Sequence, residues 1–342
     1  MQHPVYYRWL GLVAFGLVAC EGSRAPTQPD LTPADAPIAA AGAGSWSPRA
    51  PTLYDQFIYG YDLATAPDAS GNSIVYAFGG ASSDDGGVGR AIIAYNVAAD
   101  AWSKRTPLVD VYASNGVGKI GNKLYFSGGK LGAGNLPDFT NRLWAYDYTQ
   151  DRMIRKADMP IFSAEGVTGV IGTRLYVLPG ACGGNAYPNP GYCAEEATRR
   201  FYRYDPGTDT WTSRRQTPHY HRGGAAAVIA GKLYVAGGVG PDILGVADLD
   251  VYDPETNTWR SLAPLPTAGF ARGAALGGEF HVLVVRYDGT TPDFRHYAYS
   301  PVTGQWKTKA PPDVIGSATK VTLNGSARIF TATGNRSALF TP

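Results

Sequence analysis

The sequence lacks the features that mark several large classes of protein. Only 17% of its residues are charged, the formal net charge is +2, and the lysines and arginines form no cluster. Proteins that bind nucleic acid carry a basic patch, so no nucleic-acid partner is expected. Its three cysteines are few and have no nearby histidine to complete a metal-binding set, so neither a metal nor a cofactor is expected.

Glycine and aromatic residues are abundant instead. The 342 residues include 43 glycines and 22 tyrosines. Aromatic residues favour strands and glycines favour the turns between them, so this composition is typical of many short β-strands. Length alone would allow two domains of ~150 residues each, but the composition and the repeats described below favour a single all-β body.

Residues 1–20 are predicted to form a signal peptide. Arg8 precedes the uncharged apolar stretch Trp9–Val18, which is shorter than the ~20 residues that a membrane-spanning helix needs. The stretch ends in Leu17-Val18-Ala19-Cys20, which resembles the lipobox of bacterial lipoproteins. The resemblance implies cleavage before Cys20 and lipidation of its thiol. The alternative is a signal peptide that merely contains a cysteine.

The residues after Cys20 predict how the protein is attached to the cell envelope. Residues 21–44 are rich in proline, alanine and threonine and poor in large apolar side chains, so they are expected to form a flexible tether. By the same resemblance, Glu21 favours the outer membrane over the inner one. We therefore expect an exported protein attached to the cell envelope only by its lipid, on the periplasmic side or at the cell surface.

One motif recurs along the rest of the chain: a tyrosine followed seven residues later by a tryptophan. The copies are Tyr95–Trp102, Tyr204–Trp211, Tyr252–Trp259 and Tyr299–Trp306, while Tyr146–Met153 keeps the spacing without the indole. Turn-forming residues lie between the two positions, most clearly in Asp253-Pro254-Glu255-Thr256-Asn257. Each copy therefore predicts a β-hairpin. The tryptophans are expected to fill the space between neighbouring repeats, each with a large buried area.

A second unit precedes each hairpin, an alternating apolar run that ends in glycine. Its copies are Tyr76–Gly80, Tyr125–Gly129 and Tyr234–Gly238, with weaker versions at Tyr176–Gly180 and Phe330–Gly334, and Phe280–Val285 fills the remaining place. A strand of small residues such as Gly224–Ile229 comes before it, so each repeat holds four strands. The glycines are expected to allow positive φ or close backbone approach.

These repeats resemble the Kelch family, in which ~50 residues form one blade of a β-propeller. The resemblance covers residues 45–342 and implies an all-β, six-bladed Kelch-type propeller. The last repeat has only three strands before the chain ends, and Trp46-Ser47-Pro48-Arg49-Ala50-Pro51 matches residues 259–264. We therefore expect the amino-terminal strand to complete the last blade and close the ring.

Cys182 and Cys193 flank a loop rich in glycine, proline and asparagine. In an exported protein, two cysteines that close a short loop predict a disulfide bond. Such a bond would stabilise the protein by ~3 kcal/mol at most, mainly by ordering the loop.

The order of strands in a blade predicts which face binds ligands. Connections between strands 2 and 3, and those from strand 4 to strand 1 of the next blade, emerge on one face. The 2–3 connections are long, at roughly 81–90, 130–141, 181–199, 239–247 and 286–294, and long loops on a rigid scaffold commonly carry binding residues. Polar candidates at the channel mouth on this face are Tyr61, Tyr112, Asn115, Glu165, His219, His221, Arg222 and Arg272.

Five of these candidates invite specific hypotheses. In related propellers, arginines placed like Arg222 and Arg272 contact carboxylates or sugars; alternatively they satisfy backbone carbonyls at the rim. Glu165 would first form an ion pair with Arg222. Two imidazoles, from His219 and His221, could face one side of a strand, but no third metal ligand is evident.

No catalytic set is recognisable, so the leading hypothesis is a monomeric, non-catalytic module that binds a protein or a glycan. The alternative is an enzyme similar to the periplasmic sialic acid mutarotase, with Glu165 as acid/base and Arg222 and Arg272 holding a carboxylate. A structural envelope protein without a small ligand is the third hypothesis. Fold alone does not decide between them.

Overall fold

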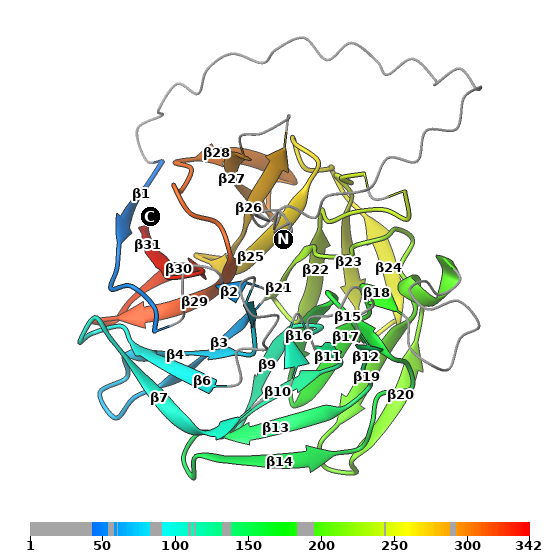
Figure 1. Ribbon diagram of the computed structural model, residues 1–342. Coiled ribbons are helices and arrows are strands. Elements are labelled where there is room, and N and C mark those ends of the chain that lie inside the picture. The colour runs from blue at the N-terminus through cyan, green and yellow to red at the C-terminus, as the bar shows by residue number, and fades with distance from the viewer. Residues whose placement is uncertain are drawn as a thin grey trace, which may run out of the picture.

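The computed structural model describes residues 43–53, 58–59, 61–82, 91–108, 111–112, 114–131, 138–182, 195–242, 244–287 and 292–342. These residues form a ring of six four-stranded sheets, the blades of a β-propeller (Figure 1). The prediction of an all-β, six-bladed propeller is therefore confirmed. The predicted signal peptide, its Cys20 and all but the last two residues of the tether lie outside the described residues.

The first three blades hold the first half of the ring. Blade 1 contains β3 (Asp62–Pro67), β4 (Ser73–Phe78), β6 (Ala91–Asn96) and β7 (Ala101–Leu108). Blade 2 contains β9 (Val117–Ile120), β10 (Lys123–Ser127), β13 (Leu143–Asp147) and β14 (Arg152–Lys156). Blade 3 contains β16 (Val167–Ile171), β17 (Arg174–Leu178), β19 (Phe201–Asp205) and β20 (Thr210–Arg214).

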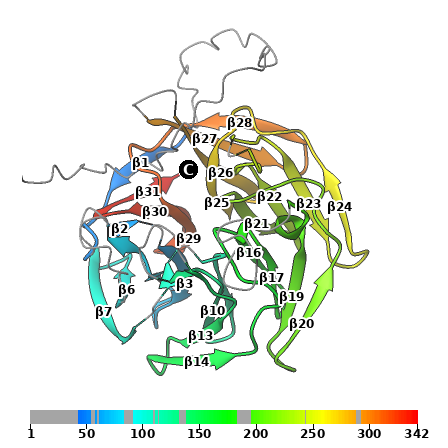
Figure 2. The same ribbon diagram turned by 45° about the vertical axis from the view of Figure 1, so that its right-hand side comes forward.

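The other three blades complete it. Blade 4 contains β21 (Ala225–Ile229), β22 (Lys232–Ala236), β23 (Leu249–Asp253) and β24 (Thr258–Ser261). Blade 5 contains β25 (Phe270–Leu276), β26 (Glu279–Tyr287), β27 (Pro292–Ser300) and β28 (Gln305–Lys309). Blade 6 contains β29 (Ser317–Leu323), β30 (Ser326–Thr333), β31 (Arg336–Thr341) and β1 (Ser45–Pro48). Figure 2 shows the first strands of the blades gathered around the centre.

The two chain ends meet in blade 6. Strand β1 pairs antiparallel with β31, from Ser45 opposite Thr341 to Pro48 opposite Ala338. The indole of Trp46 packs against Phe340, with ring centroids 5.2 Å apart. The predicted closure of the last blade by the amino-terminal strand is thus confirmed, and it leaves no open seam in the ring.

The predicted hairpins form with each tyrosine directly opposite its tryptophan, as Tyr252 is opposite Trp259. The tyrosine is fully buried, and the tryptophan is partly buried and packs against the layer between blades, as expected. Each indole also reaches the neighbouring blade with its N–H: Trp259 Nε1 donates to the carbonyl of Arg215 over 2.8 Å. The indole is therefore both a packing surface and a hydrogen-bond donor between blades.

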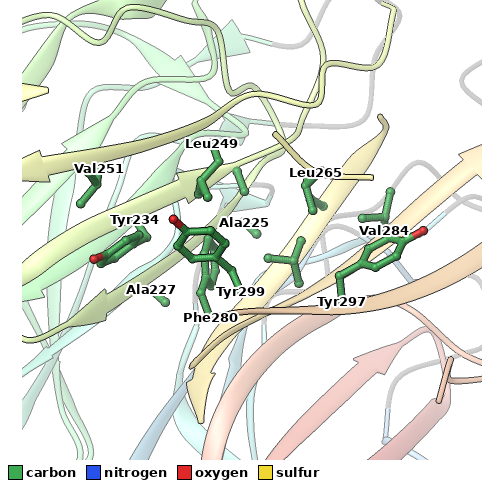
Figure 3. Packing of buried hydrophobic residues seen from close by; sticks show 13 residues of the cluster. Ala225, Ala227, Tyr234, Leu249, Val251, Leu265, Phe280, Val284, Tyr297 and Tyr299 are labelled. Carbon is green, nitrogen blue, oxygen red and sulfur yellow. The ribbon is translucent and has the colours of Figure 1, made fainter. Parts of the chain in front are cut away.

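The hydrophobic core consists of packed layers between neighbouring blades. Figure 3 shows the layer between blades 4 and 5, where Tyr234, Phe280 and Tyr299 lie close together beside Leu249 and Val251. The repeated glycine pairs lie at positive φ, for example Gly237 at 63° and Gly238 at 105°, as expected. Among the described residues the only helix is the short 3₁₀ turn Glu195–Arg199, and none is long and apolar enough to cross a membrane.

Candidate functional site

Three small sheets show which connections share a face of the propeller. In each, a segment that enters a blade pairs with the segment between that blade's strands 2 and 3. They are β2 (Ile58–Tyr59) with β5 (Ala81–Ser82), β8 (Val111–Tyr112) with β11 (Lys130–Leu131) and β12 (Asp138–Phe139), and β15 (Ser163–Ala164) with β18 (Ala181–Cys182). The 4–1 and 2–3 connections therefore emerge together, as predicted. We call this side the loop face; much of its long loops, including Cys193, lies outside the described residues.

The first strands of all six blades enclose a central channel. Its cavity measures about 510 Å³, which is the size of a site for a small ligand or a protruding side chain. Asp62, Ser114, Glu165 and Arg272 line it at the loop face. The channel mouth is therefore polar and charged, whereas the spaces between blades are apolar.

Glu165 lies between two cations at this mouth. Arg222 donates from Nε to Glu165 Oε2 over 2.6 Å, and the ammonium of Lys130 contacts Oε1. Burial alone would raise the pKa of the Glu165 carboxyl, but the charges of Lys130 and Arg222 outweigh it and hold that pKa at about 2. Glu165 is therefore a fixed carboxylate that joins blades 2, 3 and 4, and the expected ion pair with Arg222 is present.

The backbone of Glu165 is strained. Its φ is 58°, in the left-handed region, and Gly223 has φ 65° at the equivalent place in blade 4. A residue other than glycine in this region costs about 1 kcal/mol or more, and such residues cluster at functional sites. The carboxylate is therefore held at the mouth at a cost in stability.

Arg272 presents one side of its guanidinium to the channel. Nη1 donates to the carbonyls of Gly223 and Ala271, each over 2.8 Å. This is the alternative role predicted for the arginines, in which they satisfy backbone carbonyls at the rim. No hydrogen bond to another described residue uses Nε or Nη2, which leaves these donors for a ligand. A guanidinium with free donors suits a carboxylate or another planar anion.

Asp62 is a second carboxyl at the same level. It accepts hydrogen bonds from the backbone N–H of Ser114 over 2.9 Å and from its hydroxyl over 2.6 Å. Burial raises the pKa of Asp62 to about 6, against the opposing effects of these hydrogen bonds and of the Arg272 charge. Asp62 can therefore exchange a proton near neutral pH, which Glu165 cannot do.

The register of the blades places Asp62 and Arg272 at one depth. Asp62 is paired with Phe78, which lies two residues after Tyr76 in the second strand of blade 1. Arg272 is paired with Leu283, which lies two residues after His281, the residue that takes the place of Tyr76 in blade 5. Blades 1 and 5 therefore present opposite charges at the same level, separated by blade 6. Asp62 was not among the residues predicted from the sequence, although it occupies the same place in its first strand as Arg272 does.

Two other predicted residues are buried away from the channel. Asn115 is fully buried; its amide donates to Ser163 Oγ over 2.8 Å, and its Oδ1 accepts the N–H of Gly166 over 3.1 Å. His221 is buried, with Nδ1 3.0 Å from the carbonyl of Gly237. The hydrogen bonds of both side chains join segments of the protein to one another.

His219 and His221 meet at one carboxylate rather than at a metal site. His219 Nδ1 lies 3.0 Å from Asp250 Oδ2, and His221 Nε2 lies 3.1 Å from the same oxygen. Asp250 is fully buried and accepts the hydroxyl of Ser261 as well, over 2.8 Å. Within the described parts of the chain, no group of three histidines, cysteines or acids could hold a metal ion.

The remaining candidates are placed only in part. Tyr61 is buried at the channel wall and donates from its hydroxyl to the carbonyl of Gly334 over 3.3 Å. The backbone of Tyr112 pairs with that of Lys130 in the small sheet, but its side chain lies outside the described parts. Lys130 itself was missed, because nothing in the sequence of a 2–3 connection predicts that it reaches Glu165.

Comparison with known proteins agrees with this architecture. Residues 66–285 match the profile of the KLHDC2/KLHL20/DRC7 Kelch-repeats domain. Kelch repeat and BTB domain-containing protein 12 of Homo sapiens is 30% identical over 183 residues, which are 49% of this chain and 29% of that protein. Kelch-like protein 38 of Rattus norvegicus is 32% identical over 146 residues, or 42% of this chain and 22% of that protein.

The chain spans less than a third of the length of these two relatives. Among solved structures, that of YjhT is similar with a TM-score of 0.63 and 16% sequence identity, over 85% of this chain and 95% of that chain. At this identity the likeness concerns the fold alone.

Proposed function

The chain belongs to the Kelch-repeat family, whose propellers generally bind protein partners, and from this we propose that it is a binding module that holds its ligand at the channel mouth of the loop face. The observation that carries the proposal is the group of charged side chains there. Lys130, Glu165, Arg222 and Arg272 come from blades 2 to 5, and Asp62 comes from blade 1. A polar mouth on a rigid ring is suited to recognition.

The surroundings of the mouth favour a protein ligand over a glycan. Three exposed apolar side chains lie on the 4–1 and 2–3 connections: Leu53 is 48% exposed, Phe162 40% and Leu244 67%. Phe270, the first residue of β25, is 37% exposed. Exposed apolar side chains beside a charged centre are typical of protein interfaces. A partner segment with a carboxylate would place its charge on Arg272 and its apolar residues on these side chains.

We also propose that the module is exported and attached to the cell envelope, with the outer membrane favoured. The apolar stretch Trp9–Val18 and the lipobox-like Leu17–Cys20 support export and lipidation of Cys20, and residues 21–44 would serve as the tether. In that compartment Cys182 and Cys193 would form a disulfide at the base of a loop-face loop. Globomycin-sensitive lipidation of Cys20, absent in Cys20→Ser, is the test.

The binding proposal is tested by probing the purified chain with a peptide-display library and a glycan array. Selected ligands should contain carboxylates, and Arg272→Gln should weaken their binding at least tenfold. Arg260→Gln is the matched control, because Arg260 is exposed on β24 at the outer edge of blade 4. Ligands from the peptide library alone would support a protein partner, and equal binding by Arg272→Gln and wild type would contradict the proposed site.

One observation favours a second candidate, a sugar mutarotase. Ring opening of a cyclic sugar moves a proton from the anomeric hydroxyl to a base and delivers a proton to the ring oxygen, so it needs a group that exchanges protons near neutral pH. Asp62 meets this requirement, while Glu165, the acid/base expected from the sequence, is fixed as a carboxylate. Mutarotation of N-acetylneuraminate, followed by NMR, should then be accelerated and should be lost in Asp62→Asn but not in Glu165→Gln.

A further inference from the structure

One buried carboxylate in blade 4 holds the 4–1 connection that leads to the mouth. Asp250 lies in β23, the third strand of the blade, and its side chain is fully buried. Every second residue of the segment 217–221 reaches its Oδ2 atom: Thr217 Oγ1 lies at 3.4 Å, His219 Nδ1 at 3.0 Å and His221 Nε2 at 3.1 Å. The connection is therefore attached to blade 4 at three points.

This carboxylate is particular to blade 4. Asp250 stands two residues before the buried Tyr252 of its strand. The residues at the equivalent place in the other five blades are uncharged: Ile93, Trp144, Tyr202, Tyr297 and Ala338. Since five blades fold without a charge here, and burying a charge costs stability unless it is hydrogen-bonded, Asp250 serves the connection rather than the blade.

The carboxyl of Asp250 is ionised in this setting. Burial alone would raise its pKa, but the interactions with His221 and the hydrogen bond from Ser261 outweigh burial and hold the pKa below its usual range. An ionised acceptor makes stronger hydrogen bonds than a neutral one. The attachment of the connection is therefore firm.

The attached segment runs directly into the mouth. The N–H of Gly223 donates to the carbonyl of Glu165 over 2.7 Å, and the carbonyl of Gly223 accepts Nη1 of Arg272 over 2.8 Å. The carbonyl of Arg222 accepts the N–H of Val239 over 2.9 Å, while its side chain holds Glu165. Arg222 and Gly223 thus connect the carboxylate of blade 3 with the guanidinium of blade 5.

Gly223 depends on its neighbours for its position. It has no side chain to pack, and its φ of 65° lies in the left-handed region that glycine enters freely. His221, two residues earlier, is held at both ring nitrogens, since Nδ1 lies 3.0 Å from the carbonyl of Gly237 and Nε2 faces Asp250. Its own carbonyl accepts the N–H of Gly224 over 3.0 Å. The bonds of His221 therefore fix the chain on both sides of Gly223.

We propose that Asp250 is a positioning residue of the mouth, which acts through His221. By fixing His221 it places Arg222 and Gly223, and these in turn place Glu165 and Arg272 for a carboxylate ligand. Donors that are already in position lose less freedom when a ligand binds. The effect on the ligand rests on the proposed function, whereas the placement of Arg222 can be measured without a ligand.

The test compares the wild type with the double variant Asp250→Leu/His221→Leu. Replacing both partners of a buried polar pair by apolar groups can be nearly neutral for stability, so the midpoint of urea unfolding should stay close to that of the wild type. In the ¹⁵N-labelled full chain, the bond to Glu165 should protect the Nε–H of Arg222 from exchange with water. Exchange should be at least tenfold faster in the double variant; Arg222→Lys assigns the signal.

Two further variants keep this measurement decisive. His221→Phe retains a ring without its two nitrogens, should accelerate the exchange as well, and decides the question if the double variant does not fold. Asp248→Asn is the matched control, because this carboxylate lies 3.6 Å from Nε2 of His219 but is partly exposed and does not contact His221. It should leave the exchange unchanged. Wild-type protection of the Arg222 N–H in folded double variant or in His221→Phe would overturn the proposal.

The same variants are then titrated with N-acetylneuraminate as a carboxylate probe. The double variant and His221→Phe should bind it at least fivefold more weakly than the wild type, and Asp248→Asn should bind it equally well. If the wild type does not bind the probe, carboxylate binding at the mouth is contradicted while the exchange rates still decide the placement of Arg222. Wild-type affinity in a variant whose Arg222 N–H exchanges faster would also contradict the positioning role.

Discussion

The hydroxyl of Tyr204 donates a hydrogen bond to Oδ1 of Asp209 over 2.5 Å, across the outer hairpin of blade 3. Asp209 also accepts the backbone N–H of Ala157, from the chain leaving blade 2, over 3.0 Å. The arrangement is repeated around the ring. Its other copies are Tyr95 with Asp100, Tyr146 with Asp151 and Tyr252 with Asn257. The acceptor after the turn therefore joins the buried tyrosine of its own blade to the blade before it.

Asp209→Ala should destabilise the propeller by about 1–3 kcal/mol, since the buried Tyr204 hydroxyl and the Ala157 N–H both lose their acceptor. Asp209→Asn should cost less, because Asn257 already occupies the equivalent position in blade 4 and accepts through its amide oxygen. The midpoint of urea unfolding measures the difference. Glu255→Ala is the control, an exposed acid in a turn; equal losses in Asp209→Ala and the control would contradict this role.

Met153→Trp should stabilise the protein. Met153 is opposite Tyr146, at the one hairpin copy that lacks its indole. In the next blade, Trp211 Nε1 donates to the carbonyl of Ala157 over 2.8 Å. Thr106 corresponds to Ala157, because its N–H donates to Asp151 as that of Ala157 donates to Asp209, so its carbonyl is the acceptor for an indole at position 153. A new donor to that carbonyl should contribute ~1 kcal/mol, seen as a higher urea midpoint. Met153→Phe supplies the ring without the N–H and should give none of this gain.

Acid should weaken the seam of the ring through two buried histidines. His281 Nδ1 lies 3.0 Å from His296 Nε2, and His296 packs on Trp46 and Phe340. Burial lowers the pKa of His281 to about 4 and that of His296 to about 3, with the charge of Lys309 adding to the effect.

Unfolded histidine titrates near 6.5, so between pH 6.5 and 4 the unfolded chain binds more protons than the folded one. Lowering the pH from 7 to 5 should therefore reduce the free energy of unfolding, by up to about 2 kcal/mol for each histidine. Glu279 lies 3.8 Å from His281 Nε2 and moderates the loss. The slope of stability against pH should flatten in His281→Phe/His296→Phe. The raised pKa of Asp62 makes the folded chain bind more protons at low pH, so Asp62 contributes to the slope with the opposite sign. Its contribution is the same in the wild type and in the double variant. An unchanged slope in the double variant would refute the role of the two histidines.

Binding of a carboxylate at the mouth should strengthen as the pH falls through about 6. Burial raises the pKa of Asp62 to about 6, and below that value Asp62 is neutral and no longer offsets the charge of Arg272. With N-acetylneuraminate as probe, affinity should rise severalfold between pH 7 and 5. Asp62→Asn should bind at pH 7 as wild type does at pH 5, with no pH dependence; a wild-type affinity that falls on acidification would exclude this role.

The fold could be predicted from the sequence because its signals are local and repeated. Tyr252 and Trp259 indicate a hairpin within eight consecutive positions, and the five copies of this spacing indicate a repeated blade. The closure of the ring could be predicted because residues 46–51 resemble residues 259–264 in sequence. This comparison does not depend on how far apart the two segments lie in the folded protein.

The candidate site could be predicted only in part, because its properties arise from residues far apart in the chain. Arg222 and Arg272 were found by their place before or within a first strand. The state of Asp62 depends on burial by other blades and on Ser114, 52 positions away. Likewise, no pattern around Lys130 shows that it meets Glu165, 35 positions later.

The pairing of Ser45 with Thr341 has one more consequence. Since the first and last strands are already neighbours in one sheet, the propeller has no privileged starting point. A gene rearranged to begin at any turn between blades, with the old ends joined by a short linker, would encode the same closed ring. The natural order leads into β1 through Ala43 and Gly44, and the carbonyl of Ala43 accepts the N–H of Ala310 at the end of blade 5.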